Sequence, residues 1–374
     1  MTEFIDHSRA DASPRDWQHL LHLDAVLLLG LLVTSAFGLV VLYSASGQDM
    51  GVLTRQLIRL GAAFATMALV AQLPTQWFMR WTPWLYGVGV CLLVAVLAFG
   101  DIGKGAQRWL DLKILRFQPS EMMKLTVPMM VAWYLSEYRL PPSGLRLLVS
   151  GLLILVPVML IAVQPDLGTA VLIAGAGFFA VFLAGMYWRL LIGMVVACTA
   201  GLPVVWHFMH DYQRQRVITF LNPEQDPLGA GYHIIQSKIA IGSGGMFGKG
   251  WLNGTQAHLE FLPERSTDFI FAVLGEEFGL MGILLLLTLY ATIIVRSVYI
   301  ATQAQDTFSR LLGGSLAMTF FIYIIVNTGM VTGLLPVVGL PLPLVSYGGT
   351  SMVTLMAGFG MLMSIHTHRK LLPT

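Results

Sequence analysis

Four ionisable side chains are concentrated in a short stretch that precedes a long apolar segment. The stretch Leu259–Phe271, LEFLPERSTDFIF, contains Glu260, Glu264, Arg265 and Asp268, although only 11% of the 374 residues are charged. A carboxylate can act as a general base that removes a proton from a reacting hydroxyl group. The stretch is therefore the first candidate for a reactive site.

Asp268 has two interpretations that the residues alone leave open. Ser266–Asp268 are all good helix N-caps, and a carboxylate there also complements the helix dipole. Alternatively, Asp268 is a general base on the outer aqueous side of a membrane. Glu264 and Glu260 precede it by four and eight residues, but Pro263 disfavours a continuous helix through all three. We expect these carboxylates to converge around a turn.

A second group of charges lies in the segment Asp101–Lys124, DIGKGAQRWLDLKILRFQPSEMMK. Its cations are Lys104, Arg108, Lys113, Arg116 and Lys124. Lys and Arg are usually sparse on the outer side of a membrane protein. Cations placed there indicate a site for an anionic ligand such as a phosphate or a lipid headgroup. Alternatively, the count of spans is wrong by one here, or the cations pair locally with Asp101, Asp111 and Glu121.

Glu121 and Lys124 are spaced i, i+3 directly after Pro119. They can form a structural ion pair that makes Lys124 tolerable near the membrane. Lys124 can also join Arg108 and Arg116 in an anion pocket that Glu121 orients. Both roles are compatible.

Three further carboxylates have mainly structural interpretations. Glu276 and Glu277 lie roughly 12–14 Å into the apolar helix that follows Asp268, where a carboxylate must face a polar interior, a cation or backbone at a helix break. We favour that structural role over direct chemistry. Asp166, in the turn QPDLG, is predicted to cap the next helix.

Several mechanisms lack their sequence signatures. The chain contains no Walker loop, nucleophile elbow, dinucleotide fingerprint or histidine cluster with metal-ligand spacing. We therefore expect no metal centre built from such a cluster and no nucleic-acid partner. Outward-facing carboxylates opposite outward-facing cations suit a lipid-linked phosphate substrate that reacts or moves at the outer surface.

The composition excludes an ordinary soluble domain. Hydrophobic residues make up 56% of the chain and the mean hydropathy is +0.73, whereas a soluble surface needs more charge. Several stretches reach the length of about 20 apolar residues that crosses a bilayer. The predicted fold class is an all-α polytopic membrane protein.

The hydropathy pattern predicts about ten transmembrane helices. We expect them at residues 25–44, 57–73, 84–100, 120–136, 146–163, 169–186, 190–208, 268–295, 311–334 and 347–365. Basic residues in alternate connections place both termini in the cytoplasm. Residues 1–24 and 367–374 are then cytoplasmic tails around a single membrane domain over 25–366, with a long outer loop at about 209–267.

Two stretches are predicted to be broken or re-entrant. Gly231–Trp251 is weakly apolar and could enter the membrane as a half-helix that ends in a glycine-rich turn. Gly333–Ser351 has too many prolines and glycines for a straight helix. Irregular backbone at membrane depth is tolerated where protein or a wet cavity covers it.

Six long motifs in a fixed order resemble the shape, elongation, division and sporulation (SEDS) family. The resemblance covers residues 15–370. The motifs are GAQRWL (Gly105–Leu110), RFQPSEMMK (Arg116–Lys124), QPDLGT (Gln164–Thr169), YHIIQSKIAIGSGG (Tyr232–Gly245), FLPERSTDFIFAVLGEEFG (Phe261–Gly279) and GLPLPLVSYGGTS (Gly339–Ser351).

The resemblance implies a ten-helix peptidoglycan glycosyltransferase of the bacterial inner membrane. Members polymerise lipid II, an undecaprenyl-pyrophosphoryl disaccharide-pentapeptide, on the outer face, together with a class B penicillin-binding protein that crosslinks the product. The family's essential acidic residue corresponds to Asp268. Glu260, Arg116 and Lys124 match positions around the family's outward cavity, and Trp109 matches a functionally sensitive tryptophan.

That activity assigns roles to the charged residues. Asp268 would deprotonate the acceptor's GlcNAc 4-hydroxyl, with Glu260 in support. The leaving pyrophosphate needs nearby cations, supplied by Lys124, Arg116, Arg108 and Lys238 or by a bound divalent ion such as Mg²⁺ or Mn²⁺. Displacement would invert the donor's anomeric configuration.

The other substrate-binding candidates are Glu121 and Ser243. Two alternative functions remain open from the sequence: a flippase that moves lipid II across the bilayer, and a non-catalytic scaffold for the penicillin-binding protein. A flippase needs polar groups that reach both faces of the membrane, whereas the charges here gather on the predicted outer side.

Overall fold

The protein is a bundle of long helices. The computed structural model describes residues 22–103, 106–111, 116–209, 211–223, 230–258 and 264–368. Each predicted span overlaps one helix: α2 (Ala25–Ala45), α3 (Met50–Ala71), α4 (Thr75–Phe99), α5 (Pro119–Ser136), α6 (Gly144–Val163), α7 (Leu167–Leu183), α8 (Trp188–Phe208), α12 (Ile270–Thr302), α13 (Thr307–Val331) and α14 (Thr350–Thr367). The helical fold class is confirmed, and the number of helices that cross a bilayer stays a prediction.

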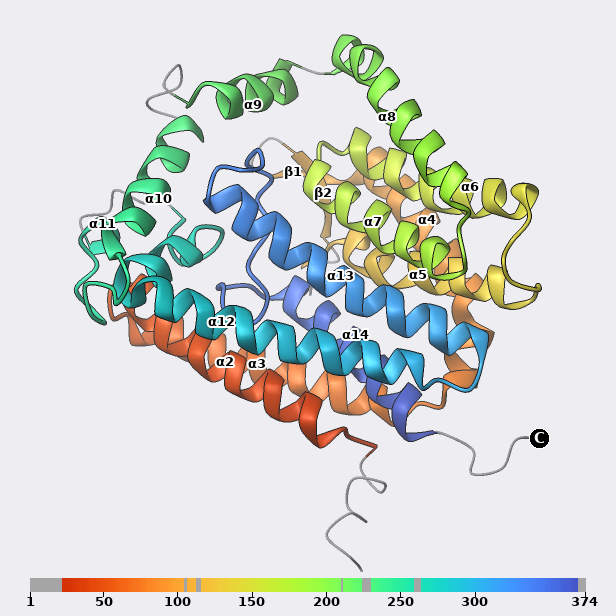
Figure 1. The fold of residues 1–374 in the computed structure, drawn as a ribbon, viewed down its shortest axis with the longest axis horizontal. Helices are drawn as coiled ribbons and strands as arrows, with labels where there is room; N and C mark the ends of the chain where they lie inside the picture. Colours follow the sequence, from red (N-terminus) through yellow and green to blue (C-terminus); the bar gives the residue numbers. More distant parts are fainter. Residues whose placement is uncertain are drawn as a thin grey trace, which may run out of the picture.

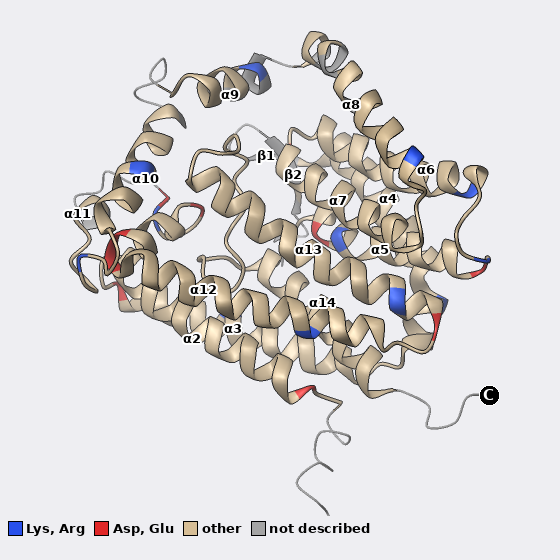
Figure 2. Ribbon diagram, in the orientation of Figure 1, with Lys and Arg blue, Asp and Glu red and all other residues tan. Residues whose placement is uncertain are grey.

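The long helices have the length and surface of membrane spans. Within the described residues, α2, α4, α6, α12 and α13 are long and apolar enough to cross a bilayer. Their outer faces expose large apolar side chains, among them Leu29 on α2, Leu148 on α6 and Leu285 on α12. Figure 2 shows that the helices are largely uncharged. Such surfaces are stable in lipid and costly in water.

Helix α13 lies in the middle of the bundle. It packs against α5, α7, α12 and α14, with α2 and α3 beyond α12 and α14 (Figure 1). Tyr290 of α12, Phe320 of α13 and Phe359 of α14 form an edge-to-face aromatic series with centroid distances of 5.5 and 5.2 Å. These contacts make a rigid core beside the irregular segment that follows α13.

The predicted cationic outer loop contains a small sheet that the sequence analysis did not anticipate. Strands β1 (Asp101–Gly103), β2 (Ala106–Asp111) and β3 (Arg116–Phe117) pair antiparallel in the order β1-β2-β3. The strands are too short to give a clear period-two pattern of apolar residues. The fold is therefore helical with this one sheet in its described part.

The segment between α8 and α12 forms three further helices. They are α9 (Asp211–Leu221), α10 (Ala230–Gly244) and α11 (Thr255–His258), and α8, α9 and α10 follow one another around one edge of the bundle (Figure 1). Helix α10 ends in a turn in which Gly245, Gly248 and Gly250 have positive φ. The prediction of a helix ending in a glycine-rich turn is confirmed, whereas its depth in a membrane stays a prediction.

The segment between α13 and α14 is irregular, as its prolines and glycines predict. It runs from Thr332 to Gly349 through turns, with positive φ at Gly333, Gly339 and Leu344. The Tyr290 hydroxyl donates a 2.6 Å hydrogen bond to the Pro343 carbonyl and ties the segment to α12. We call residues 333–349 the re-entrant segment.

Candidate active site

Asp268 lies in a tight turn at the start of α12. The Glu264 carbonyl accepts hydrogen bonds from the N–H groups of Thr267 (3.1 Å) and Phe269 (3.3 Å), and Glu264 itself has φ of 55°. The N-cap of α12 is Phe269, which makes no side-chain cap bond to a described residue. The interpretation of Ser266–Asp268 as the helix cap is therefore wrong, because the turn is closed by backbone bonds to residue 264 and the helix starts later.

The turn is attached to the bundle through its carbonyl groups. Asn327 of α13 donates through Nδ2 to the carbonyl oxygen of Asp268 at 3.0 Å. From the re-entrant segment, the Ser346 hydroxyl donates to the Thr267 carbonyl at 2.5 Å and the Tyr347 N–H donates to the Ser266 carbonyl at 2.8 Å. Three successive carbonyls are thus bonded, so the backbone beneath Asp268 is firmly positioned.

The Asp268 side chain is half-buried and lies beside the re-entrant segment. A Cβ built on Gly339 would stand 3.4 Å from Asp268 Oδ2. Gly339 has φ of 69°, a left-handed conformation that glycine adopts without strain. The carboxylate therefore faces bare backbone, with part of its surface accessible.

Lys124 and Glu121 form a buried ion pair on α5. Lys124 Nζ lies 2.6 Å from Glu121 Oε1, and both side chains are less than a tenth exposed. Glu121 Oε1 also accepts a 2.9 Å hydrogen bond from Ser351 in the first turn of α14. Glu121 Oε2 is buried without a hydrogen-bond partner among the described residues. The predicted local pairing of these two residues is confirmed.

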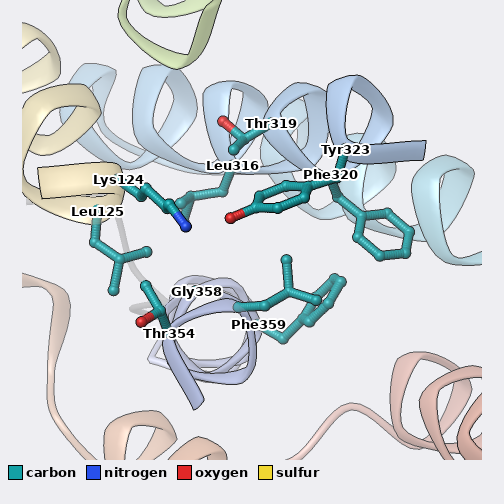
Figure 3. A pocket seen from close by; sticks show the side chains of 10 residues that line it. Lys124, Leu125, Leu316, Thr319, Phe320, Tyr323, Thr354, Gly358 and Phe359 are labelled. Carbon is teal, nitrogen blue, oxygen red and sulfur yellow. The ribbon is translucent and has the colours of Figure 1, made fainter. Parts of the chain in front are cut away.

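Lys124 lines a narrow cavity between α5, α13 and α14. Its ammonium group is 5.4 Å from the centroid of the Tyr323 ring, and the Tyr323 hydroxyl points toward it (Figure 3). Thr319 and Thr354 also line the cavity, and their hydroxyl groups donate to the Ser315 and Thr350 carbonyls. A buried cation beside the Tyr323 hydroxyl can hold an anionic oxygen that enters the cavity.

The re-entrant segment lies next to neighbours of both groups. A second cavity is lined by Tyr323 and Ser351 and by Leu342 and Ser346 of the re-entrant segment. Tyr323 and Ser351 are the residues that contact Lys124 and Glu121, and Ser346 bonds the Asp268 turn.

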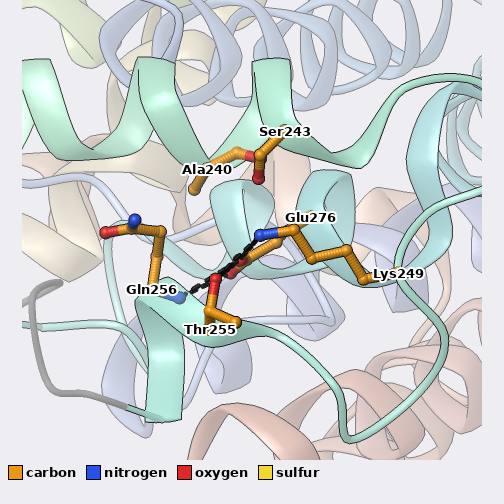
Figure 4. A network of polar contacts seen from close by, with 6 residues as sticks. All are labelled: Ala240, Ser243, Lys249, Thr255, Gln256 and Glu276. Atoms are coloured by element: carbon orange, nitrogen blue, oxygen red, sulfur yellow. Dashed lines mark hydrogen bonds and ion pairs between the residues drawn. The ribbon is translucent and has the colours of Figure 1, made fainter.

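Glu276 has a structural environment, as the sequence analysis favoured. Its carboxylate accepts hydrogen bonds from Lys249 Nζ (2.6 Å), the Thr255 hydroxyl (2.9 Å) and the Gln256 N–H (3.1 Å to Oε1), and the side chain is fully buried (Figure 4). Such a set of donors satisfies the carboxylate and holds the loop after α10 onto α12.

Glu277 and the break in α12 complete this attachment. Glu277 Oε1 accepts a hydrogen bond from the Ser44 hydroxyl. The helix has non-helical backbone at Gly279 (φ 63°), and Gly250 N–H donates to the Glu277 carbonyl at 3.0 Å. A Cβ on Gly279 would stand 2.3 Å from the Gly248 nitrogen, so glycine is required for this close approach.

The predicted role of Asp166 is confirmed. Asp166 is the N-cap of α7, and its Oδ1 accepts a 3.3 Å hydrogen bond from the Thr169 N–H. Gln118, just before α5, donates to Asp166 Oδ2 at 3.2 Å. This bond joins the start of α5 to the start of α7.

The remaining candidates lie on the paired strands β2 and β3, on α10, or outside the described residues. Arg108 and Trp109 are on β2 and Arg116 is on β3, with the Trp109 side chain half-buried. Lys238 is exposed on α10, and its side chain would meet a Cβ on Gly333 at 2.3 Å. Two further positions are Ser243, which is exposed on α10 and donates to the Ala240 carbonyl, and Glu260, which lies outside the described residues.

Metal ligation is not visible in the described part of the chain. Within it, no group of three or more His, Cys, Asp or Glu side chains is arranged to hold a metal ion. Lys124 is a described cation that lines a cavity between packed helices.

Three site residues were not singled out from the sequence. Asn327 interrupts the apolar run IYIIVNTGMV, and a polar amide inside a membrane helix is a usable signal. Tyr323 and Ser351 gave no such signal, because a tyrosine among apolar residues and a serine at a helix start are both common. Their positions became visible only in the packing of α5, α13 and α14.

The fold and the site together define a multi-pass membrane protein with a carboxylate in a fixed turn and a buried ion pair. The family model for FtsW, RodA and SpoVE, described as "Cell cycle protein", matches residues 19–371. The chain belongs to this family.

Curated relatives with similar sequences have related names. The chain is 56% identical over 353 residues to peptidoglycan glycosyltransferase MrdB of Escherichia coli strain K12, covering 94% of this chain and 95% of the relative. It is 39% identical over 375 residues to the probable peptidoglycan glycosyltransferase FtsW of Trichlorobacter lovleyi, covering 95% and 96%.

Solved structures share the fold. A chain from a study of polymerization and crosslinking by a peptidoglycan synthase complex matches with a TM-score of 0.81 and 35% identity, covering 93% of this chain and 98% of that one. The rod shape determining protein RodA of Thermus thermophilus matches with a TM-score of 0.70 and 30% identity, covering 93% and 98%.

Proposed function

We propose that this protein is a peptidoglycan glycosyltransferase that polymerises lipid II into glycan strands at the outer face of the bacterial inner membrane, for cell elongation and rod shape. Support comes from the family membership and from the name and 56% identity of the Escherichia coli relative. The proposal includes ten spans over residues 25–366, with residues 1–24 and 367–374 as cytoplasmic tails.

Asp268 is the general base in this proposal. The observation that carries this role is the bonding of three successive carbonyls beneath it, which holds a half-exposed carboxylate in one place. A fixed base removes the proton from the acceptor's 4-hydroxyl as its oxygen attacks the donor's anomeric carbon. Positioned acid–base groups typically contribute about 10²–10⁴-fold to a rate. Glu260 is proposed to support Asp268 from the same loop.

Lys124 stabilises the departing pyrophosphate. The bond from the anomeric carbon to the phosphate oxygen breaks as the new glycosidic bond forms, and the electron pair leaves with the lipid pyrophosphate. A buried ammonium group in a water-poor cavity stabilises such charge strongly. Glu121 and Ser351 orient Lys124, whereas Arg108, Arg116 and Lys238 are proposed to attract the substrate headgroup from the outer side, with Trp109 and Ser243 as further contacts.

A class B penicillin-binding protein is the proposed partner. The solved peptidoglycan synthase complex that coordinates polymerization with crosslinking supports this choice by similarity. In such a pair, the glycan made at the membrane passes directly to the transpeptidase.

The test is a glycan-polymerisation assay with purified protein and lipid II. We expect glycan chains when the partner is present, and uncrosslinked chains when a crosslinking inhibitor is added. Formation of chains only after a different polymerase is supplied would contradict the proposal. Transfer of lipid II across proteoliposomes without chain formation would favour a flippase instead.

A further inference from the structure

We infer that Asn327 is a positioning residue that sets the gap between the Asp268 carboxylate and the re-entrant segment. The inference rests on the proposed role of Asp268 as the base. Asn327 lies on α13, the central helix, and its side chain is completely buried. It touches the Asp268 backbone and not the reacting atoms, so its role is indirect.

The Asn327 amide bridges two chain segments. Its Nδ2 donates to the Asp268 carbonyl at 3.0 Å and to the Leu340 carbonyl at 2.6 Å. Because both neighbouring atoms are acceptors, the amide nitrogen must face them, which fixes the orientation of the side chain. An apolar side chain of similar size would leave both carbonyls without this donor.

The second bridged carbonyl belongs to the stretch of backbone beside the carboxylate. Leu340 directly follows Gly339, where an added Cβ would stand 3.4 Å from Asp268 Oδ2. Asn327 thus binds both the backbone of Asp268 and the backbone of Leu340 in the re-entrant segment, so it fixes their positions relative to each other. Movement of either segment would change the space in which an acceptor hydroxyl meets the base, and a displacement of about 1 Å can cost roughly 10²-fold in rate.

The amide oxygen of Asn327 is buried and has no hydrogen-bond partner among the described residues. A buried acceptor without a partner costs about 1–3 kcal/mol. The two bonds from Nδ2 to buried carbonyls offset that cost.

The variants separate donor function from packing. Asn327→Ala removes the bridge and leaves a small cavity, whereas Asn327→Asp keeps the shape and loses both donors when ionised. The matched control is Tyr86→Phe, which deletes a 2.8 Å hydrogen bond from the Tyr86 hydroxyl to the Leu153 carbonyl between α4 and α6. Each protein is purified with its partner and assayed for kcat, KM and thermal stability.

We expect Asn327→Ala and Asn327→Asp to lower kcat by roughly 10- to 100-fold near neutral pH while KM changes by less than about 3-fold. Tyr86→Phe should match their loss of stability and keep the wild-type kcat. If Asn327→Ala does not fold, Asn327→Ser, which retains one donor, takes its place and should show an intermediate kcat.

Measuring activity over a range of pH distinguishes the donor role from a packing role. Loss of packing alone would not make the ratio of variant to wild-type activity depend on pH. A protonated carboxyl at position 327 can donate one hydrogen bond, so the activity of Asn327→Asp relative to wild type should rise as the pH falls. The titratable groups around this position are Asp268, His233 of α10 through Phe269, and the Glu121–Lys124 pair through Tyr323. They are common to both proteins, so the ratio removes the part of their contribution that the substitution leaves unchanged.

The outcomes distinguish this inference from the proposed function. If Asp268→Asn is inactive while Asn327→Ala and Asn327→Asp keep the wild-type kcat, Asn327 is not a positioning residue and the base stands. The inference is also overturned if kcat of the Asn327 variants falls only in proportion to their thermal stability and the activity ratio of Asn327→Asp to wild type does not depend on pH. If Asp268→Asn polymerises at the wild-type rate, the roles of Asp268 as the base and of Asn327 as its positioning residue are both contradicted.

Discussion

Asp268, in the turn before α12, and Glu276, inside α12, are carboxylates eight residues apart in sequence, and their surroundings differ. Glu276 is fully buried, and its oxygens are occupied by Lys249, Thr255 and Gln256. Asp268 is held through its backbone, and its side chain keeps accessible surface.

The difference separates a structural carboxylate from a reactive one. Donors that occupy the oxygens of Glu276 stabilise the loop after α10 and lower the availability of those oxygens for a proton. Donors that act on the carbonyl of Asp268 fix the position of its backbone. Predictions from this contrast follow, ordered by the size of the expected effect.

Asp268→Asn is expected to have the largest effect. The amide keeps the shape of the side chain and cannot accept the proton, so polymerisation should fall by about 10²–10⁴-fold. Thermal stability should change little, because the bonds that attach the turn to the bundle are accepted by its backbone carbonyls. The check is the initial rate of glycan formation from lipid II, and a rate within about threefold of wild type would contradict the assignment.

Lys124→Met tests the buried pair. Removing the ammonium group leaves Glu121 buried as an unpaired carboxylate, which should destabilise the protein by about 3–5 kcal/mol. The double variant with Glu121→Gln should regain most of this stability and remain inactive, because the cation is still absent. Thermal unfolding together with the polymerisation assay checks both, and recovery of activity in the double variant would show that Lys124 only balances charge.

Gly279→Ala tests the break in α12. The new Cβ would need φ of 63° and would stand 2.3 Å from the Gly248 nitrogen, at a cost of about 1–3 kcal/mol. The matched control is Gly61→Ala on α3, where a Cβ meets no described heavy atom within 4 Å. Gly61→Ala should be neutral or slightly stabilising, and equal unfolding temperatures for the two variants would contradict the packing argument.

Asp24→Asn should have the smallest effect. Asp24 caps α2 and binds Arg296, which lies in the later part of α12. Burial raises the pKa of Asp24, but hydrogen bonds from Arg296 and from the Leu27 N–H, with the charge of Arg296, lower it by more, so the pKa lies below its usual value. Asp24 therefore stabilises the fold above about pH 4, and the contribution is lost as the pH falls further. The variant should lose about 1 kcal/mol at neutral pH and show a weaker dependence of stability on acid.

Much of this arrangement could be predicted from the sequence. Apolar runs located each long helix, the prolines and glycines of 333–349 predicted irregular backbone, and the turn residues around Asp166 predicted a cap. These features depend on local patterns. The i, i+3 spacing of Glu121 and Lys124 likewise predicted their pairing within one helix turn.

The rest depends on contacts between distant segments. No local pattern shows that Asn327 reaches the carbonyl of Asp268, 59 positions earlier in the chain, or that Ser351 reaches Glu121 across 230 positions. The cap assigned to Ser266–Asp268 was wrong because backbone bonds to the Glu264 carbonyl close that turn and the helix starts later. The short strands of β1–β3 carry too few residues to reveal their periodicity.

The central claim is that Asp268, in the turn before α12, is a reactive carboxylate and that Glu276, inside α12, is a structural one. A paired comparison of Asp268→Asn with Glu276→Gln tests this claim most directly. Both variants replace a carboxylate by an amide and are measured for polymerisation rate and unfolding temperature in the purified complex. The account predicts that Asp268→Asn loses the rate and keeps the unfolding temperature, while Glu276→Gln lowers the unfolding temperature and keeps the rate within about threefold. Loss of rate in Glu276→Gln together with a wild-type rate in Asp268→Asn would contradict it.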